Sequence, residues 1–522
     1  MINRSTSPRN LACFSSVVIP LMVAFTSVAS RADVPDSAAV RSLSRAQLPA
    51  AMDAYLEFLR IPNDGHFPEQ IMANVRWVDR ALTELGFGTR VLTSNDVPHV
   101  FAERKVDGAR GTILFYLQID GQPVDGDAWN QANPFEPALK RRTDDAWVEL
   151  PLNSWRSDFD PEDRIFARSA SDSKGPAIAL LSALRIMEEQ GWMPDYNLKL
   201  IADFQEELGS PTLPALVEAE RELFAADVML IMDGTRHLSN LPTLTFGARG
   251  LATLTLTVFG ATRNLHSGQY GNFAPNPVFA LSHLLASMKD EQGRVTIAGY
   301  YDGVSLSETE RRLLAEVPED KGDIERSLGI ASADAVGSTY QEALQFPSLN
   351  VRGLRAAWTG DEVRTLIPRQ AVAEIDMRLV PETPADRQLA LVVAHIREQG
   401  FHIVSDEPTS QEREQHRKLI RVEQRTGSKP FRTPMSSPLG NWLASALTRV
   451  YGTGFIKMRT TGGSQPIAPF INTLGVPAIS VRIPNPDNNI HAPDENLRLG
   501  NFLEGIETCL AILTEPWDAT RL

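Results

Sequence analysis

Cysteine is scarce in this sequence. Its 522 residues include only two, Cys13 and Cys509. So few thiols exclude a framework of disulfides as the source of stability. Cys509 lies in the apolar stretch of residues 506–513, where the spacing predicts a buried helix. We therefore interpret it as a core residue and not as a nucleophile.

Positive charge is also in deficit. The chain has 51 lysines and arginines against 65 aspartates and glutamates, which gives a formal net charge of −14. No basic run offsets this balance, so we expect no binding to nucleic acid. Internal repeats and low-complexity tracts are absent as well. A length of 522 residues exceeds what one hydrophobic core usually supports, so two domains are expected.

Long apolar runs are missing after the N-terminus, so no later segment is predicted to span a membrane. At the N-terminus, Arg4 and Arg9 precede an apolar stretch over residues 11–28, and small residues follow. This order is typical of a secretory signal peptide. We predict that residues 1–32 are removed and that the mature protein is secreted or periplasmic, without membrane contact. Cleavage is predicted near one of three positions: Ala29, Ser30 or Ala32.

Short apolar runs alternate with helical stretches in the first half of the chain. Strands are predicted at residues 112–117, 198–202 and 228–232, and a buried helix at residues 175–187. Such alternation indicates an α/β layer architecture. The same style returns near the C-terminus, with an apolar run over residues 476–482.

The middle of the chain shows a different pattern. Polar and apolar residues alternate strictly over residues 252–258 and largely over residues 371–380, which is typical of half-exposed antiparallel strands. A polar, charged stretch follows at residues 407–434. We therefore predict an α/β domain with a mixed sheet that is interrupted by a smaller α+β insertion. The predicted α/β domain comprises residues 45–246 and 435–522, and the insertion residues 247–434.

The adjacent carboxylates of Glu206 and Glu207 are the most informative polar feature. They follow the apolar run that ends at Ala202. Two like charges at a strand end repel each other unless a positive charge lies between them, and a bound metal ion supplies one. One carboxylate would then be a ligand and the other a proton acceptor. Taken alone, the pair also fits the acidic first turn of a solvated helix.

Further polar clusters are associated with the other elements of the predicted α/β domain. They are Gln118 with Asp120, Asp172, Asp233 and His491. Singly, each has a plain structural explanation, such as a helix cap, a turn or a solvated loop. In open α/β sheets, however, ligands bind at the carboxyl ends of strands, so these side chains are expected to converge. Carboxylates with one imidazole suit a divalent metal such as zinc, manganese or cobalt.

These motifs resemble those of the co-catalytic zinc peptidases that include carboxypeptidase G, aminoacylase and carnosine dipeptidase. The carnosine-dipeptidase branch is the most similar, and the resemblance covers residues 50–515 with the motifs in the same order. The matching segments are Gln118-Ile-Asp120-Gly-Gln-Pro123, Ser171-Asp172-Ser-Lys-Gly175, Glu206-Glu207, Asp233-Gly234 and His491-Ala-Pro-Asp-Glu-Asn496. The resemblance implies a metallopeptidase catalytic domain with an inserted lid and dimerisation domain.

The resemblance also implies a role for each side chain. Glu206 would be the general base, and Asp120 would orient a ligand or the base. Asp172 would bridge two metal ions. The other implied ligands are Glu207 and His491 for the first ion, and Gln118 and Asp233 for the second.

The insertion carries further similar motifs. The segment around His266 resembles the family's lid motif, whose histidine reaches the active site of the partner subunit and helps to hold the substrate carbonyl. A homodimer is therefore implied. Thr365 and Arg378 lie in segments that resemble the family's clamp on a substrate carboxylate, and Ser464 lies in one that resembles its second substrate loop. A guanidinium suits a free carboxylate, although an exposed strand charge explains Arg378 equally well.

Gln118 departs from the family pattern, which has histidine at this position. A glutamine can ligate only through its amide oxygen, which is a neutral and weak donor to zinc. Three interpretations stay open. The second metal site is weak and the protein is a one-metal hydrolase, or that site prefers a harder ion such as manganese, or activity is lost and only binding remains.

We predict a metal-dependent hydrolase of amide bonds that holds one or two divalent ions, zinc first and manganese or cobalt as alternatives. Its substrates would be dipeptides or N-acyl amino acids with a free carboxylate, cleaved in a dipeptidase-like or carboxypeptidase-like reaction. Glu206 would take a proton from a metal-activated water, and the metal and His266 would stabilise the oxyanion. The competing hypothesis is a catalytically impaired peptide-binding protein on a metallopeptidase fold.

Overall fold

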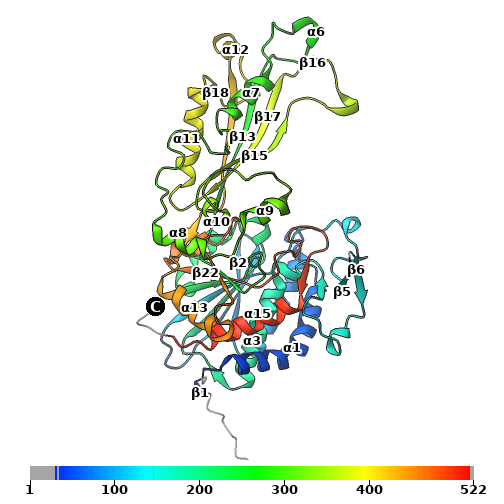
Figure 1. Cartoon of the computed structure of the whole chain (residues 1–522), viewed down its shortest axis with the longest axis vertical. Helices are drawn as coiled ribbons and strands as arrows, with labels where there is room; N and C mark the ends of the chain where they lie inside the picture. Colours follow the sequence, from blue (N-terminus) through cyan, green and yellow to red (C-terminus); the bar gives the residue numbers. More distant parts are fainter. Residues whose placement is uncertain (1–29, 32–33, 145, 518–522) are drawn as a thin grey trace, which may run out of the picture.

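Figure 1 shows the computed structural model of the chain, which describes residues 30–31, 34–144 and 146–517. Nearly all of the predicted signal peptide, including Cys13, lies outside these residues. Within the described ranges, no helix is both long and apolar enough to cross a membrane.

A mixed sheet of eight strands forms the centre of the α/β part, in the order β2-β3-β9-β4-β10-β22-β11-β21. The four inner strands β9, β4, β10 and β22 are parallel to one another. Antiparallel pairs join β2 to β3, β3 to β9 and β11 to β22. The strands span Gly88–Ser94 (β2), Val97–Arg104 (β3), Asn197–Asp203 (β9), Thr112–Gln118 (β4), Val228–Ile231 (β10), Ala478–Arg482 (β22), Thr243–Thr245 (β11) and Ile456–Met458 (β21).

Helices cover both faces of this sheet, which is why its inner strands are continuous apolar runs. On one face, α3 and α15 contact each other and α1, and α13 packs on α15. On the other face lie α4, α5 and α14, around a second group of buried side chains. The helix bounds are Ser37–Leu59 (α1), Pro68–Glu84 (α2), Gly175–Glu189 (α3), Leu213–Ala219 (α4), Arg221–Phe224 (α5), Pro438–Tyr451 (α13), Ala468–Leu474 (α14) and Leu499–Leu513 (α15).

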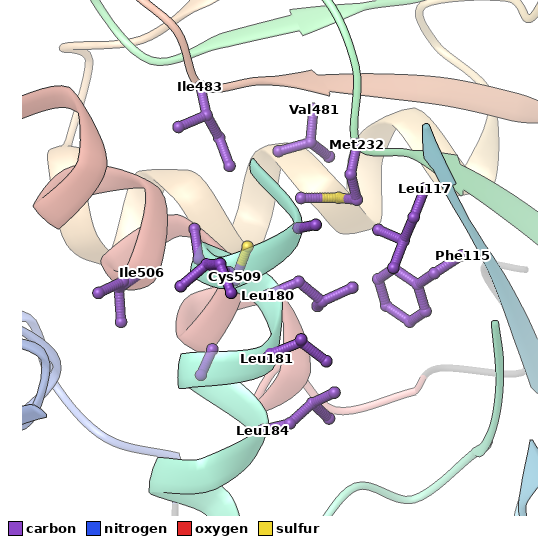
Figure 2. Close-up of a cluster of buried hydrophobic side chains, with 14 of the residues drawn as sticks. Phe115, Leu117, Leu180, Leu181, Leu184, Met232, Val481, Ile483, Ile506 and Cys509 are labelled. Atoms are coloured by element: carbon purple, nitrogen blue, oxygen red, sulfur yellow. The ribbon is translucent and has the colours of Figure 1, made fainter. Parts of the chain in front are cut away.

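The main core lies between the sheet and helices α3 and α15. Figure 2 shows sheet side chains, including Phe115 and Leu117, beside leucines of α3 and beside Ile506 and Cys509 of α15. Each large apolar side chain buried here contributes about 1.5–3 kcal/mol to stability. The prediction for Cys509 is confirmed, because its thiol is free and buried, and burial raises its pKa.

A second sheet, in the order β15-β17-β13-β19-β18, forms the insertion, which extends away from the α/β part. β13 and β17 pair over ten positions, and their alternating burial matches the alternation in the sequence. Helices α7 and α11 pack on this sheet around a separate core. The bounds are Ser348–Arg355 (β15), Gln370–Leu379 (β17), Gly250–Phe259 (β13), Leu419–Thr426 (β19), His402–Val404 (β18), Pro277–Ala286 (α7) and Ala385–Glu398 (α11).

The charged stretch of residues 407–434 contains strand β19, which the sequence pattern did not reveal. β19 pairs with β13 over eight positions. Only its first two residues are buried, while the rest of Leu-Ile-Arg-Val-Glu-Gln-Arg-Thr is half-buried or exposed. Because the strand buries so little, its sequence lacks the apolar alternation that predicts a strand.

The chain passes between the two parts at two neighbouring points. Gly247–Ala248 (β12) and Phe431–Arg432 (β20) pair with each other in antiparallel fashion. The predicted boundaries at residues 247 and 434 fall close to this pair, and they stay a prediction.

Smaller elements complete the described fold. A four-stranded sheet has the order β23-β7-β5-β6. Its strands are Asn496–Arg498, Arg164–Phe166, Ala138–Thr143 and Ala146–Leu150. The others are Ser30–Arg31 (β1), Trp192–Met193 (β8), Leu265–His266 (β14), Leu366–Ile367 (β16), Ser267–Tyr270 (α6), Glu308–Ala315 (α8), Lys321–Leu328 (α9), Tyr340–Ala343 (α10) and Ser410–Gln415 (α12).

Candidate active site

Three predicted ligands come together although they are far apart in the sequence. One ligand atom from each of Asp172, Glu207 and His491 lies within 4.8 Å of the others. His491 Nε2 is 3.1 Å from Asp172 Oδ2 and 3.3 Å from Glu207 Oε2. The hydrogen bond to Asp172 raises the pKa of His491, while burial raises the pKa of both carboxyls.

Asp172 is held in place by Glu495. The carboxylate of Glu495 accepts hydrogen bonds from the backbone N–H groups of Ser169, Ser171 and Asp172, each at 2.9 Å, and from Ser171 Oγ at 2.8 Å. Arg168 Nη1 donates to the same carboxylate at 2.8 Å, in a buried ion pair. Glu495 was not predicted to have a role from the sequence, although it lies in the same motif as His491.

Asp120 fixes the turn that carries the two adjacent glutamates. Its Oδ1 accepts from the backbone N–H of Glu206 at 2.9 Å, and its Oδ2 accepts from that of Glu207 at 3.1 Å. The turn is a 3₁₀ segment, Glu206–Leu208, and it ends at Gly209 with φ of 80°. A glycine suits this left-handed position because it has no side chain to clash. Asp120 therefore contacts the backbone of the site and orients its carboxylates.

Glu206 lies among several other carboxylates. Burial raises its pKa well above the usual value, and the neighbouring Asp233, Asp172, Glu207 and Asp120 raise it further. Crowded carboxylates of this kind are stabilised by a cation. Two carboxylates and an imidazole at close range are a donor set that zinc accepts. The residues present at Asp172, Glu207 and His491 therefore fit a divalent metal ion.

Asp233 acts electrostatically on Asp172 but is not one of the three clustered ligands, and Gln118 ends the neighbouring strand β4. Asp233 Oδ1 accepts from Ser173 Oγ at 3.1 Å, and Asp233 Oδ2 accepts from Gln465 Nε2 at 2.7 Å. Gln118 Nε2 is buried and has no hydrogen-bond partner among the described residues. The group of three ligands found in the described part of the chain does not include Asp233. Ser173 and Gln465 were not singled out from the sequence.

Arg378 and Ser464 are brought into contact at the junction of the two parts. Arg378 Nη1 donates to Ser464 Oγ at 3.0 Å, although the residues come from β17 and from the loop before α14. Arg378 Nε also lies 3.6 Å from Asp376 Oδ2. The guanidinium thus keeps donors for a further anionic group.

His266 and Thr365 lie elsewhere. They are adjacent, because Ser267 N donates to Thr365 O at 3.1 Å and β14 pairs with β16. Figure 1 shows β16 and helix α6, which begins after His266, at the far end of the insertion, well away from helix α3 and strand β22 of the α/β part. The structure therefore does not bring these two residues to the metal ligands of the same chain.

The described geometry agrees with comparisons to known proteins. The model of peptidase family M20/M25/M40 matches residues 114–515. The chain belongs to this family. It is 27% identical to the Cys-Gly metallodipeptidase dug1 of Schizosaccharomyces pombe over 78% of this chain and 81% of that protein. It is 26% identical to human Beta-Ala-His dipeptidase over 80% of this chain and 77% of that one.

A solved structure shows the same architecture. The M20 family metallo-carboxypeptidase from Sulfolobus solfataricus superposes with a TM-score of 0.73 and 27% identity, covering 89% of this chain and 98% of that chain. The predicted family and fold class, a mixed α/β metallopeptidase with an inserted domain, are confirmed. The predicted enzyme class, a metallopeptidase, is confirmed as well.

The predicted secreted or periplasmic location is wrong. The matched Cys-Gly metallodipeptidases are cytosolic, which contradicts export of this chain. The prediction depended on basic residues followed by an apolar stretch and small residues. That pattern is one of composition, and composition alone does not determine whether a segment is recognised for export.

Proposed function

We propose that this M20 enzyme is a dipeptidase in which Asp172, Glu207 and His491 hold a zinc ion and Glu206 is the general base. The proposal rests mainly on one observation: three ligand atoms lie within 4.8 Å of one another, beside the buried side chain of Glu206. The relatives are named as dipeptidases for Cys-Gly and for Beta-Ala-His. Dipeptides are therefore the substrates that we propose for this chain.

The residues suggest how the reaction proceeds. A divalent ion at this position would supply Lewis acidity, which favours deprotonation of water at neutral pH. Glu206 accepts the proton of the attacking water and delivers it to the leaving amine, so that the amide C–N bond breaks with a neutral amine. The raised pKa of Glu206 suits this role, because a carboxylate with a raised pKa accepts a proton more readily than an ordinary one. Asp120 holds the backbone of Glu206 in position during both transfers.

Arg378 and Ser464 support recognition of a free carboxylate. We propose that their contact forms a subsite where the C-terminal carboxylate of a dipeptide, or that of an N-acyl amino acid, accepts hydrogen bonds from both side chains. Because the subsite lies where the insertion meets the α/β part, it would hold the substrate between the two.

A homodimer is the second part of the proposal. His266 precedes α6, which lies at the far end of the insertion in Figure 1, and Thr365 lies beside it, so a partner subunit would have to supply both residues. Apolar side chains of the insertion are exposed in the single chain, Phe273 at 86%, Phe279 at 67% and Val363 at 68%. Large apolar side chains that are exposed in a single chain are frequent at protein interfaces.

Replacement of Glu206 by glutamine tests the assignment of the base. We expect E206Q to keep its metal, because Glu206 is not among the three ligands, and to lose roughly 10²–10⁴-fold in kcat on dipeptides. Metal content is measured by elemental mass spectrometry and turnover by release of free amino acids. The exposed E222Q is the matched control and should match the wild type. Full turnover by E206Q would contradict the assignment.

The binding-protein alternative is tested by the same assays on the wild type. If the purified chain binds dipeptides in calorimetry but releases no amino acid after addition of zinc or manganese, the dipeptidase proposal fails.

A further inference from the structure

A row of three side chains crosses the sheet at the candidate second metal position. β4 and β10 pair with Tyr116 opposite Ile231, and continuing this register by two residues places Gln118 opposite Asp233. β10 and β22 pair with Ile231 opposite Ser480, and the same step places Arg482 opposite Asp233.

Backbone hydrogen bonds show that the chain segments after β10 and β22 stay side by side. Met229 N donates to Pro477 O, and Arg236 N donates to Pro484 O with the same spacing along both segments. Because neighbouring residues of parallel strands point to the same face, Gln118, Asp233 and Arg482 share one face of the sheet.

Arg482 is a buried cation without ordinary partners. It is 6% exposed, and its Nε and Nη2 have no hydrogen-bond partner among the described residues. Burial lowers its pKa, while the charges of Asp233 and Asp172 act in the opposite direction. A guanidinium stays protonated in proteins, and the carboxylates of Asp233 and Asp172 are the anionic groups whose charges act on it.

Gly234 makes room for this guanidinium. A Cβ at Gly234 would lie 1.2 Å from Arg482 Nη1, and the backbone there has φ of 89°. The glycine after Asp233 is therefore needed both for its backbone conformation and for the approach of the arginine. Arg482 lies directly against the residue that follows the candidate second-site ligand.

The other side chains at the candidate second metal position suit a guanidinium better than a second metal ion. Asp233 Oδ2 already accepts a hydrogen bond from Gln465, and Ser173 Oγ lies between Asp233 Oδ1 and Asp172 Oδ1, at 3.1 and 3.0 Å. Gln118 offers only a neutral amide. A second divalent ion would in addition be repelled by the fixed positive charge of Arg482.

We propose that this enzyme binds a single divalent ion, at Asp172, Glu207 and His491, and that the guanidinium of Arg482 provides the positive charge beside Asp172 and Asp233 at the second position. The identities of residues 118 and 482 are then linked, because a neutral side chain at position 118 allows an arginine in the same row of side chains. The inference rests on the proposed function for the first ion only.

Metal stoichiometry tests the inference without any measurement of turnover. The wild type, Q118H and Q118H/R482M are dialysed to saturation against zinc chloride and then analysed by elemental mass spectrometry. We expect one zinc per chain for the wild type and for Q118H, because Arg482 still occupies the second position, and two for Q118H/R482M. Two zinc ions in the wild type or in Q118H would overturn the inference, as would one in a folded Q118H/R482M.

Further variants keep the test decisive. Q118H/R482K retains a positive charge and should hold one zinc, so two would overturn the inference even if the methionine variant does not fold. Q118H/R236M is the matched control, because Arg236 is also buried with two unpartnered nitrogen atoms but pairs with Glu504. It should hold one zinc. No zinc in the wild type would overturn both the proposed function and this inference, whereas one zinc without dipeptide hydrolysis overturns only the former.

Discussion

At the scale of single residues, the position of Asp172 depends on a side chain that does not itself join the ligand cluster. The carboxylate of Glu495 accepts hydrogen bonds from three backbone N–H groups in the segment before α3, those of residues 169, 171 and 172, and from the side chain of Arg168. Groups behind metal ligands commonly change metal affinity 10–100-fold when they are replaced. Glu495 is therefore expected to matter for metal binding although no ligand atom comes from it.

Replacement of Glu495 by glutamine tests this role. An amide NH₂ would face backbone donors that now meet a carboxylate oxygen, and Arg168 would lose its buried partner. We expect E495Q to bind zinc roughly 10–100-fold more weakly and to lose about 3–5 kcal/mol of stability. Zinc affinity is measured by competition with a chelator and stability by chemical denaturation. The exposed E149Q should behave like the wild type, and unchanged affinity in E495Q would contradict the role.

The sequence predicted part of the candidate site and missed another part for a physical reason. Asp172, Glu207 and His491 follow from the tendency of polar side chains at strand ends to converge. Glu495 and Arg482 act through contacts between segments, and nothing local distinguishes a buried arginine at a strand end from an exposed one.

At the scale of elements, helix α15 carries an acid into the core beside α1, α3 and α13. Glu507 is 7% exposed, and burial raises its pKa to about 7, with Glu504 raising it and Arg41 lowering it. In the unfolded chain the same carboxyl has its usual value of 4.5. Between these two values only the folded state holds the proton, so this group lowers the free energy of unfolding as the pH rises from 4.5 to 7.

A neutral side chain at this position should remove that dependence. We expect E507Q to be more stable than the wild type at pH 8 by about 1–3 kcal/mol, and to match it near pH 4.5. Thermal unfolding at both pH values measures the difference. The exposed E189Q on α3 is the control and should follow the wild type throughout. An advantage of E507Q that is equal at both values would contradict the argument.

The elements themselves were predictable where burial is strong. Continuous apolar runs revealed β4, β9 and β10, and alternation revealed β13 and β17. β19 escaped because charged residues occupy its exposed positions. Its pairing with β13 is a long-range property that a local pattern does not contain.

At the scale of the whole molecule, the insertion separates two groups that the proposed mechanism needs together. His266 lies at its far end, while Glu206 lies in the α/β part. In a symmetric dimer with crossed insertions, each active site would combine Glu206 of one chain with His266 of the partner chain.

Mixed dimers of two inactive variants test this arrangement. E206Q and H266A carrying different tags are co-expressed, and the heterodimer is purified through both tags. One of its two sites then has both native residues, so we expect about half of the wild-type activity per dimer. A heterodimer of E206Q and D120N is the control, since both changes affect the α/β part, and it should stay inactive. No recovery with H266A would contradict a shared site.

Fold class and family followed from the order of motifs along the chain, and the comparisons confirm both. The predicted location failed because it depended on the composition of one terminal segment rather than on the folded protein. Assembly also lies beyond a local pattern, because it depends on how two copies fit each other.

The order of strands in the central sheet has a consequence for synthesis. β10 lies between β4, which is translated before it, and β22, which is translated only after the whole insertion. Until the ribosome has passed Arg482, the growing chain exposes the open hydrogen-bonding edge of β10 in the middle of an apolar layer. Such an edge can pair with other chains. Premature termination inside the insertion should therefore yield aggregates rather than a smaller folded protein.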